Sequence, residues 1–276
     1  MKEIIYNVNN VNLLWTGGWD STFQLLQLLI IQKQQVTPYY IIHAPRPSTG
    51  KELLTMRRIK NQLFKEYPHT RKLLMPIQFY SEKDLLPDLE ISNAYKSVLK
   101  KKHIGIQYEW LARFCKEKGI NDMQIGVEAP RAYSVNYWDT LLKSALIELK
   151  SNSQNIYHID PDHKNRDLVT LLKYFHFPII KITKIKMLDL VNNQGLKHIM
   201  ELTWFCQQPT NNMKPCGTCK PCRQYIEHGF SWRLPLISRI YYFIHKIFIL
   251  KFKPRLKLIL IKLGLYRDVK SINDFK

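Results

Sequence analysis

Four of the chain's five cysteines lie within seventeen positions, in a spacing that suits metal binding. They are Cys206, Cys216, Cys219 and Cys222. Four thiolates that converge on one point form a closed tetrahedral zinc site with Zn–S distances of about 2.3 Å. An iron–sulfur cluster also takes four cysteines, whereas a redox CXXC pair would leave Cys206 without a role. The spacing therefore predicts a structural Zn²⁺ site, with an iron–sulfur cluster as the alternative.

A glycine turn near the N-terminus is the second group of residues that could do chemistry. It consists of Leu14, Trp15, Thr16, Gly17, Gly18, Trp19, Asp20, Ser21 and Thr22. The glycines let backbone N–H groups approach an anion, and the hydroxyls and the positive end of a following helix add donors. Asp20 could orient the loop or hold Mg²⁺. The alternative is an ordinary tight turn with Ser21 as the N-cap; neither a Walker A loop nor Gly-X-Gly-X-X-Gly is present.

The elements that must position these residues alternate along the chain between apolar runs and helical patterns. Strands are predicted at Val11–Trp15, Pro38–His43, Leu74–Tyr80, Asp122–Val127 and Ile179–Ile182, and helices from Ser21 and at Glu52–Tyr67, Gln107–Lys118, Trp138–Lys150 and Lys184–Asn193. This alternation predicts an α/β fold with a doubly wound parallel sheet. The turn then joins the first strand to the first helix, where such folds bind phosphate. The fifth cysteine, Cys115, lies in a helical pattern and is predicted to be core packing.

Together, the Gly-Gly-Trp-Asp-Ser-Thr string and the cysteine cluster resemble the 7-cyano-7-deazaguanine synthase family of the PP-loop (N-type ATP pyrophosphatase) superfamily. The resemblance covers about residues 11–228 and includes Gly126 and Lys184. It implies an adenine-nucleotide α-hydrolase-like domain with a C-terminal zinc-binding lobe. It also implies ATP and Mg²⁺ bound by the turn and Gly126, with Asp20, Ser21 and Lys184 as catalytic residues. The implied reaction activates a small carboxylate as an acyl-adenylate and converts it with ammonia to an amide and then a nitrile.

The chain departs from this family after Gly126, where Val127-Glu128-Ala129-Pro130-Arg131-Ala132-Tyr133 replaces the usual string, and at Ile106-Gln107. Glu128, Arg131 and Tyr133 follow a predicted strand end and are substrate-side candidates, although a solvated loop is equally compatible. The acceptor is therefore open. Other hypotheses are another PP-loop adenylating enzyme, tRNA-modifying or amide-forming, and a nucleotide-binding module without catalysis.

Charge and composition describe a globular chain of 276 residues with a net charge of +20, which favours anionic partners. Residues 231–276 hold eleven Lys or Arg and two acids. Within 232–265 these cations alternate with apolar residues, in uncharged runs too short to cross a bilayer. An anionic membrane surface or a partner protein is predicted for this segment, which could also simply pack on the main domain. A tRNA partner is less favoured, and a homodimer is left open.

Three parts are predicted: an ATP-binding domain at 1–200, a zinc lobe at 201–230 and a basic amphipathic helical appendage at 231–276. Residues 1–10 do not read as a signal peptide. The predicted location is cytoplasmic, with peripheral attachment to the inner membrane surface as an extension of the appendage hypothesis.

Overall fold

A computed structural model describes residues 10–43, 46–101, 104–129, 144–149 and 155–251. The chain separates into two compact units, Met1–Trp204 and Phe205–Lys276. The boundaries predicted for three parts, at 200 and 230, remain predictions. None of the helices within the described ranges is long and apolar enough to cross a membrane.

The first unit is built on a seven-stranded sheet with the order β3-β2-β1-β4-β7-β6-β5. The strands are β1 (Val11–Leu14), β2 (Val36–Ile42), β3 (Gln78–Ser81), β4 (Met123–Gln124), β5 (Leu146–Leu149), β6 (Ile156–Ile159) and β7 (Phe175–His176). Neighbours from β3 to β7 pair in parallel, whereas β6 and β5 extend the sheet antiparallel. The predicted doubly wound, parallel-dominated α/β sheet is confirmed, with an antiparallel edge added.

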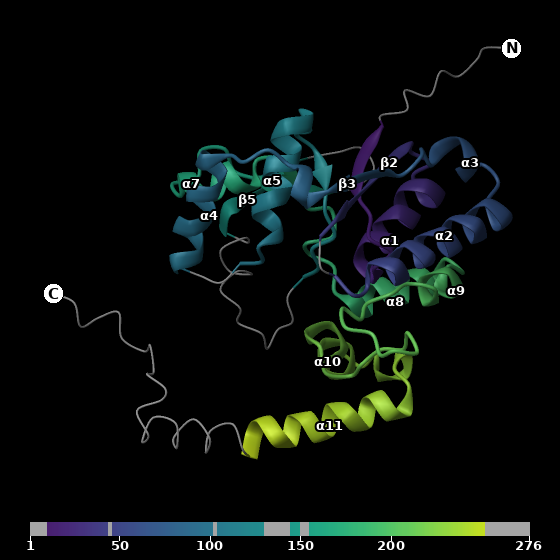
Figure 1. The fold of residues 1–276 in the computed structure, drawn as a ribbon. Coiled ribbons are helices and arrows are strands. Elements are labelled where there is room, and N and C mark those ends of the chain that lie inside the picture. Colours follow the sequence, from purple (N-terminus) through teal and green to yellow (C-terminus); the bar gives the residue numbers. More distant parts are fainter. Residues whose placement is uncertain (1–9, 44–45, 102–103, 130–143, 150–154, 252–276) are drawn as a thin grey trace, which may run out of the picture. The chain divides into compact units, whose positions relative to one another are not determined.

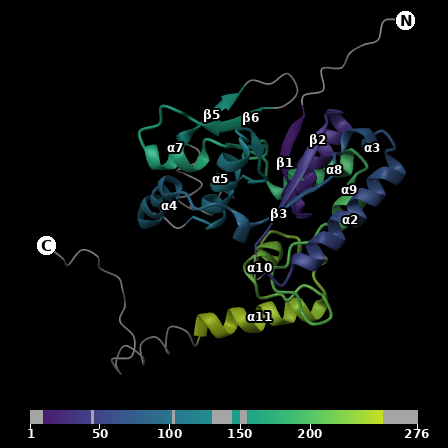
Figure 2. The same cartoon turned by 45° about the horizontal axis from the view of Figure 1, so that its top comes forward.

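Helices cover both faces of this sheet, α1, α2, α8 and α9 on one side and α4, α5 and α7 on the other (Figures 1 and 2). The bounds are α1 (Trp19–Leu26), α2 (Thr49–Glu66), α3 (Thr70–Leu73), α4 (Leu89–Lys101), α5 (Gln107–Lys118), α7 (Arg166–Leu172), α8 (Lys184–Asn193) and α9 (Lys197–Glu201). A π-helical turn, η1 (Gln27–Ile31), continues α1, and a 3₁₀ turn, η2 (Glu82–Asp84), follows β3. Parallel strands need such crossover helices, which explains why the sheet is buried on both faces.

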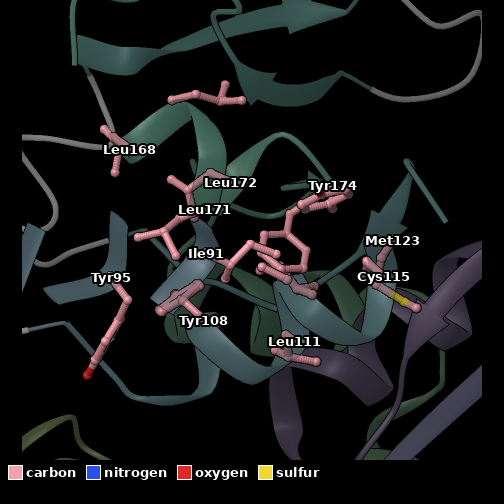
Figure 3. Close-up of a cluster of buried hydrophobic side chains, with 14 of the residues drawn as sticks. Ile91, Tyr95, Tyr108, Leu111, Cys115, Met123, Leu168, Leu171, Leu172 and Tyr174 are labelled. Atoms are coloured by element: carbon pink, nitrogen blue, oxygen red, sulfur yellow. The ribbon is translucent and has the colours of Figure 1, made fainter. Parts of the chain in front are cut away.

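One large apolar core lies between the sheet and the layer formed by α4, α5 and α7 (Figure 3). Leu111 on α5, Leu171 on α7 and Met123 on β4 are each almost fully buried within it. Cys115 is also fully buried there, and burial raises the pKa of its thiol. It is therefore a core side chain, as its place in the α5 pattern predicts.

Two predicted elements are wrong in the described residues. The helix predicted at Trp138–Lys150 is replaced at Leu146–Leu149 by strand β5, which pairs with β6. Residues 144–145 are helical, and the rest of the predicted range lies outside the described residues. A short apolar run does not distinguish strand from helix, and long-range pairing decides here. The strand predicted at Ile179–Ile182 is a turn closed by the Ile182 N–H on the Ile179 carbonyl. Pro178 lacks an N–H for the sheet, so the strand ends earlier, at His176.

The second unit has no strand in its described residues and contains α10 (Lys220–Glu227), η3 (Ser231–Arg233) and α11 (Leu236–Lys251). Its small interior includes Tyr225, whose ring stacks on Phe205 with centroids 3.9 Å apart. The Arg233 guanidinium lies 5.3 Å from the centre of the Phe205 ring. Few apolar side chains are buried among the described residues of this unit, so other interactions must contribute to holding them together.

Candidate functional site

The glycine turn lies between β1 and α1, as the sequence predicts, and its backbone is fixed by Gly17. Gly17 has φ +69°, and its carbonyl accepts the Trp204 N–H at 3.0 Å. Gly18 precedes α1 in an extended conformation, and no side chain caps the helix. Because the residue before α1 is a glycine, it offers no side-chain acceptor to the first N–H groups, which lie at the positive end of the helix. This arrangement can bind phosphate through backbone donors.

Gly126 allows the turn to pack directly against the residues after β4. A Cβ at this position would lie 2.9 Å from the Ser21 N and 3.1 Å from the Asp20 carbonyl carbon. Both distances are shorter than ordinary contacts, and the neighbours are backbone atoms that cannot rotate away. The pairing of Leu13 with Gln124 brings this stretch beside β1. Gly126 thus has a steric reason to be glycine, which supports its predicted place in the site.

Lys184, the first residue of α8, joins the turn to the residues after β4. Its Nζ donates to both Asp20 oxygens, at 2.6 and 2.8 Å, and lies 2.8 Å from Glu128 Oε1. The lysine is only 8% exposed, so two carboxylates share one buried ammonium group. Burial, followed by the charge of Asp20, raises the pKa of Glu128, while Lys184 opposes this shift. The three groups form a charge cluster with one negative charge in excess when both acids are ionised.

A cavity of about 180 Å³ opens beside the turn. Its walls are Leu14, Thr16, Gly18, Asp20, Ser21, Ile41, Arg46, Gln107, Trp110, Leu111, Ile125, Gly126 and Val127. The cavity lies beyond the carboxyl ends of β1, β2 and β4, where open α/β sheets bind ligands. It combines an apolar wall with hydroxyls, a carboxylate and the Arg46 guanidinium, a composition suited to a nucleotide or another anion.

Arg46, Gln107 and Trp110 are site residues that the sequence analysis did not identify. Arg46 follows β2, and the rule that ligands lie past strand ends could have found it. Its Nε is 3.5 Å from Glu52 Oε1. Trp110 stacks against His43, with ring centroids 6.0 Å apart. No local signal distinguishes the α5 positions that face the cavity from those that face the core.

The remaining predicted residues fall into two groups. Trp15, Trp19 and Thr22 are buried and do not line the cavity; the Trp15 indole donates to Thr22 Oγ1 at 3.1 Å and braces the turn from within. Arg131 and Tyr133 lie outside the described residues. Of the three substrate-side candidates, only Glu128 is described, and it contacts Lys184 rather than standing in a solvated loop.

The four predicted cysteines converge in the second unit. Their sulfur atoms all lie within 4.8 Å of one another, and the pairs Cys206–Cys219 and Cys216–Cys222 are each 3.9 Å apart. Sulfurs at tetrahedral corners around one zinc ion would be separated by about 3.8 Å, which follows from the Zn–S bond length. The backbone N–H of Cys216 donates to Cys206 Sγ, and that of Cys219 to Cys216 Sγ, both at 3.3 Å. This geometry fits a four-thiolate metal site.

The cluster is also packed against α11 through Gly217. Gly217 has φ +85°, and a Cβ here would lie 1.9 Å from the Ser238 carbonyl oxygen. The Ser238 hydroxyl donates to the Pro215 carbonyl at 2.5 Å. The turn that carries Cys216 and Cys219 therefore packs directly against α11.

Fold and site together define an α/β protein with a glycine turn suited to phosphate and a lobe with four converging cysteines. Residues 108–231 match the family model described as "Queuosine biosynthesis protein QueC", which confirms the resemblance to the 7-cyano-7-deazaguanine synthase family. This match is slightly under half of the chain; it contains Gly126, Glu128, Lys184 and the cysteines but not the glycine turn.

Among solved structures, the chain is similar to the U34-tRNA thiolase NcsA from Methanococcus maripaludis with its [4Fe-4S] cluster. The identity is 16%, the TM-score is 0.39, and the similarity covers 89% of this chain and 75% of that one. A comparison with curated proteins found no match at the significance required.

Proposed function

We propose that the chain is an ATP-dependent ligase of the 7-cyano-7-deazaguanine synthase type. The observation that carries the proposal is the glycine turn at the carboxyl end of β1, with Lys184 held at 2.6 Å from Asp20 and the cavity beside it. The family match over 108–231 supports the same reaction class. A phosphate loop with an adjoining pocket is what adenylate formation requires.

The proposed chemistry begins when an oxygen of the acceptor carboxylate attacks the α-phosphorus of ATP. The bond to the bridging oxygen breaks, pyrophosphate leaves, and an acyl-adenylate forms. Ammonia then attacks the acyl carbon, AMP leaves, and one proton is lost, which gives the amide. The amide oxygen would then attack the α-phosphorus of a second ATP and release pyrophosphate, and loss of AMP from carbon and of two protons from nitrogen would give the nitrile.

The residues of the candidate site each have a role in this scheme. The N–H groups after Gly18 and the hydroxyls of Thr16 and Ser21 would bind the phosphates. Lys184 would neutralise charge on the departing pyrophosphate, and Asp20 would hold Mg²⁺, which stabilises phosphate charge when bound. Arg46 and Trp110 line the wall that a base or an acceptor would contact. Glu128 would keep Lys184 beside the turn.

For the cysteine lobe we propose Zn²⁺ with a structural role. In a [4Fe–4S] cluster each cysteine binds a different iron atom, and in a [2Fe–2S] cluster two cysteines bind each iron, so the four sulfurs as a set lie further apart than around a single ion. Here all four sulfurs lie within 4.8 Å of one another, which favours one ion. Metal analysis of protein purified without added metal would test this: one zinc per chain supports it, and iron with acid-labile sulfide contradicts it.

A second enzyme candidate is another PP-loop adenylating enzyme, tRNA-modifying or amide-forming, because the acceptor-side residues differ from the family string after Gly126. Salt-sensitive tRNA binding would favour the tRNA modifier. A nucleotide-binding module without catalysis would bind ATP and release neither pyrophosphate nor AMP with any acceptor.

The decisive experiment measures pyrophosphate and AMP release from MgATP, with and without 7-carboxy-7-deazaguanine and ammonium. We expect release that depends on both, and a loss of about a thousandfold in Asp20→Ala. Asp189→Ala, an exposed acid on α8, is the matched control and should behave as wild type. Turnover at the same rate with and without 7-carboxy-7-deazaguanine would indicate a different acceptor. Absence of ATP binding would overturn the proposal.

A further inference from the structure

The helix α11 carries a continuous exposed apolar face. Its members have exposed fractions between 42% and 66%: Leu236, Ile237, Ile240, Tyr241, Phe243, Ile244, Ile247 and Phe248. At 100° per residue these side chains span about 160° of the helix circumference, and between Leu236 and Phe248 no charged residue falls within this arc. Soluble proteins seldom expose an apolar patch of this kind unless it contacts a membrane or a partner.

The opposite side of α11 is fixed to the cysteine lobe. Ser238 and Tyr242, one turn apart, are 1% and 3% exposed. The Tyr242 hydroxyl donates to Glu227 Oε1 at 3.1 Å, and the α11 backbone rests on Gly217. The lobe thus holds the helix by one side and leaves the apolar face turned away from the metal site.

The sequence on both sides of α11 carries charge of a single sign. Residues 228–267 contain nine Lys or Arg and not one Asp or Glu. On α11 itself, Arg239 and Lys246 are two turns apart on the same side of the helix, beside the apolar arc and not within it. Within the described residues, α11 is not long and apolar enough to cross a membrane. An apolar arc flanked by cations is typical of a helix that lies in the membrane interface.

We propose that α11 binds an anionic lipid bilayer, in the plane of the surface, and so attaches the protein to the membrane. The apolar arc enters the boundary between headgroups and acyl chains, and the neighbouring cations contact lipid phosphates. Nucleic acid fits less well, because its phosphates would have to meet a surface of Ile, Leu and Phe without charge. A soluble acidic partner would satisfy the cations but not explain an arc that is apolar except for the Tyr241 hydroxyl. The proposal does not depend on the enzymatic reaction.

The test is flotation of the full-length protein with vesicles of phosphatidylcholine alone or mixed with phosphatidylglycerol. We expect binding only to the anionic vesicles, weakened at high salt because cation–headgroup attraction is screened. Ile244→Glu should reduce the binding at least about tenfold, since it places a charge in the apolar boundary. The triple substitution Lys253→Gln, Arg255→Gln and Lys257→Gln should weaken it by on the order of tenfold or more.

Leu89→Glu is the matched control, because Leu89 is a 79% exposed apolar residue that begins another helix, α4. It should bind vesicles as wild type does. Metal content and melting temperature of Ile244→Glu should equal those of wild type, which separates lost binding from lost folding. The proposal is overturned by equal binding to neutral vesicles in high salt or by absence of vesicle binding. In the second case, a dimer that Ile244→Glu dissociates would assign the face to self-association.

Discussion

The two units of this protein fix their sites in different ways. In the first, Asp20, Glu128 and Lys184 come from distant parts of the chain and meet because a sheet with two helical layers brings them together. In the second, the four sulfurs come from seventeen consecutive positions and are surrounded by few buried apolar side chains. A large core can position a site without a metal, whereas a small lobe needs an additional constraint. The two units should therefore respond differently to the same kind of damage.

Removal of one metal ligand should produce the largest difference. We expect Cys219→Ser to lose the metal and to unfold the second unit, because the binding free energy of a structural zinc is also folding free energy. The first unit should keep its melting transition and its affinity for ATP. Metal analysis, calorimetry and ATP titration check these outcomes.

The matched control is Cys115→Ala, which removes a sulfur from the core of the first unit. It should leave metal content unchanged and lower the stability of the first unit alone. Equal metal content in Cys219→Ser and wild type would contradict the four-cysteine site.

The substitution Gly217→Ala should disrupt the contact between the cysteine turn and α11. The added Cβ would lie 1.9 Å from the Ser238 carbonyl oxygen, so helix or turn must move. We expect the melting temperature of the second unit to fall and metal to be lost more readily to a chelator.

Gly229→Ala separates this clash from backbone strain, because Gly229 has φ +79° and open space around its would-be Cβ. Gly229→Ala should lower the free energy of unfolding by only about 1–2 kcal/mol, the usual penalty for a non-glycine residue in the left-handed conformation. If both variants lost equal stability, contact with α11 would not be what requires a glycine at 217.

In the first unit, Gly126→Ala tests whether the turn needs support from the residues after β4. The methyl group would press on the backbone of Ser21 and Asp20 and displace the phosphate-binding groups. A displacement of about 1 Å can lower turnover about a hundredfold, so we expect a large loss of ATP turnover with metal content unchanged. Gly50→Ala in α2, with no atom near its would-be Cβ, should retain activity.

The smallest expected effect concerns the pH dependence of stability at Glu128. Because burial raises its pKa in the folded protein, neutral Glu128 stabilises the fold at acidic pH, and this contribution is lost as pH rises through the raised pKa. Glu128→Gln cannot ionise, so its melting temperature relative to wild type should increase as the pH rises above the ordinary carboxyl pKa and through the raised one. The same substitution at Glu148, an exposed acid on β5, should show no such trend.

The sequence predicted the parts of this protein that rest on local patterns. Helices α5 and α8 have the predicted bounds, because Gly119 (φ +66°) and the Thr183 cap fix their ends. The glycine turn and the four cysteines were also identifiable from local sequence, because their residue types and spacing are unusual.

The features that the sequence did not predict depend on contacts between distant segments. Residues 146–149 were expected to be helical but form strand β5 because they pair with β6, and β7 ends before Pro178, earlier in the chain than the predicted strand. Trp110 became part of the cavity wall only because α5 packs on the sheet, where Phe114 of α5 contacts Tyr39 of β2 and Tyr80 of β3. The ion pairs of Lys184 with both Asp20 and Glu128 likewise follow from sheet order, which no local pattern encodes.

The sheet order also has a consequence for synthesis of the chain on the ribosome. Strand β1 is central, yet one of its neighbours is β4, and Gln24 reaches Gln124 by a hydrogen bond of 2.7 Å across 100 residues. Long-range pairing of this kind is slow because loop-closure entropy must be overcome first. The N-terminal half therefore emerges with its future central strand lacking a partner on one side. We expect nascent chains shorter than 124 residues to remain unfolded, and the growing chain to depend on chaperones until β4 emerges.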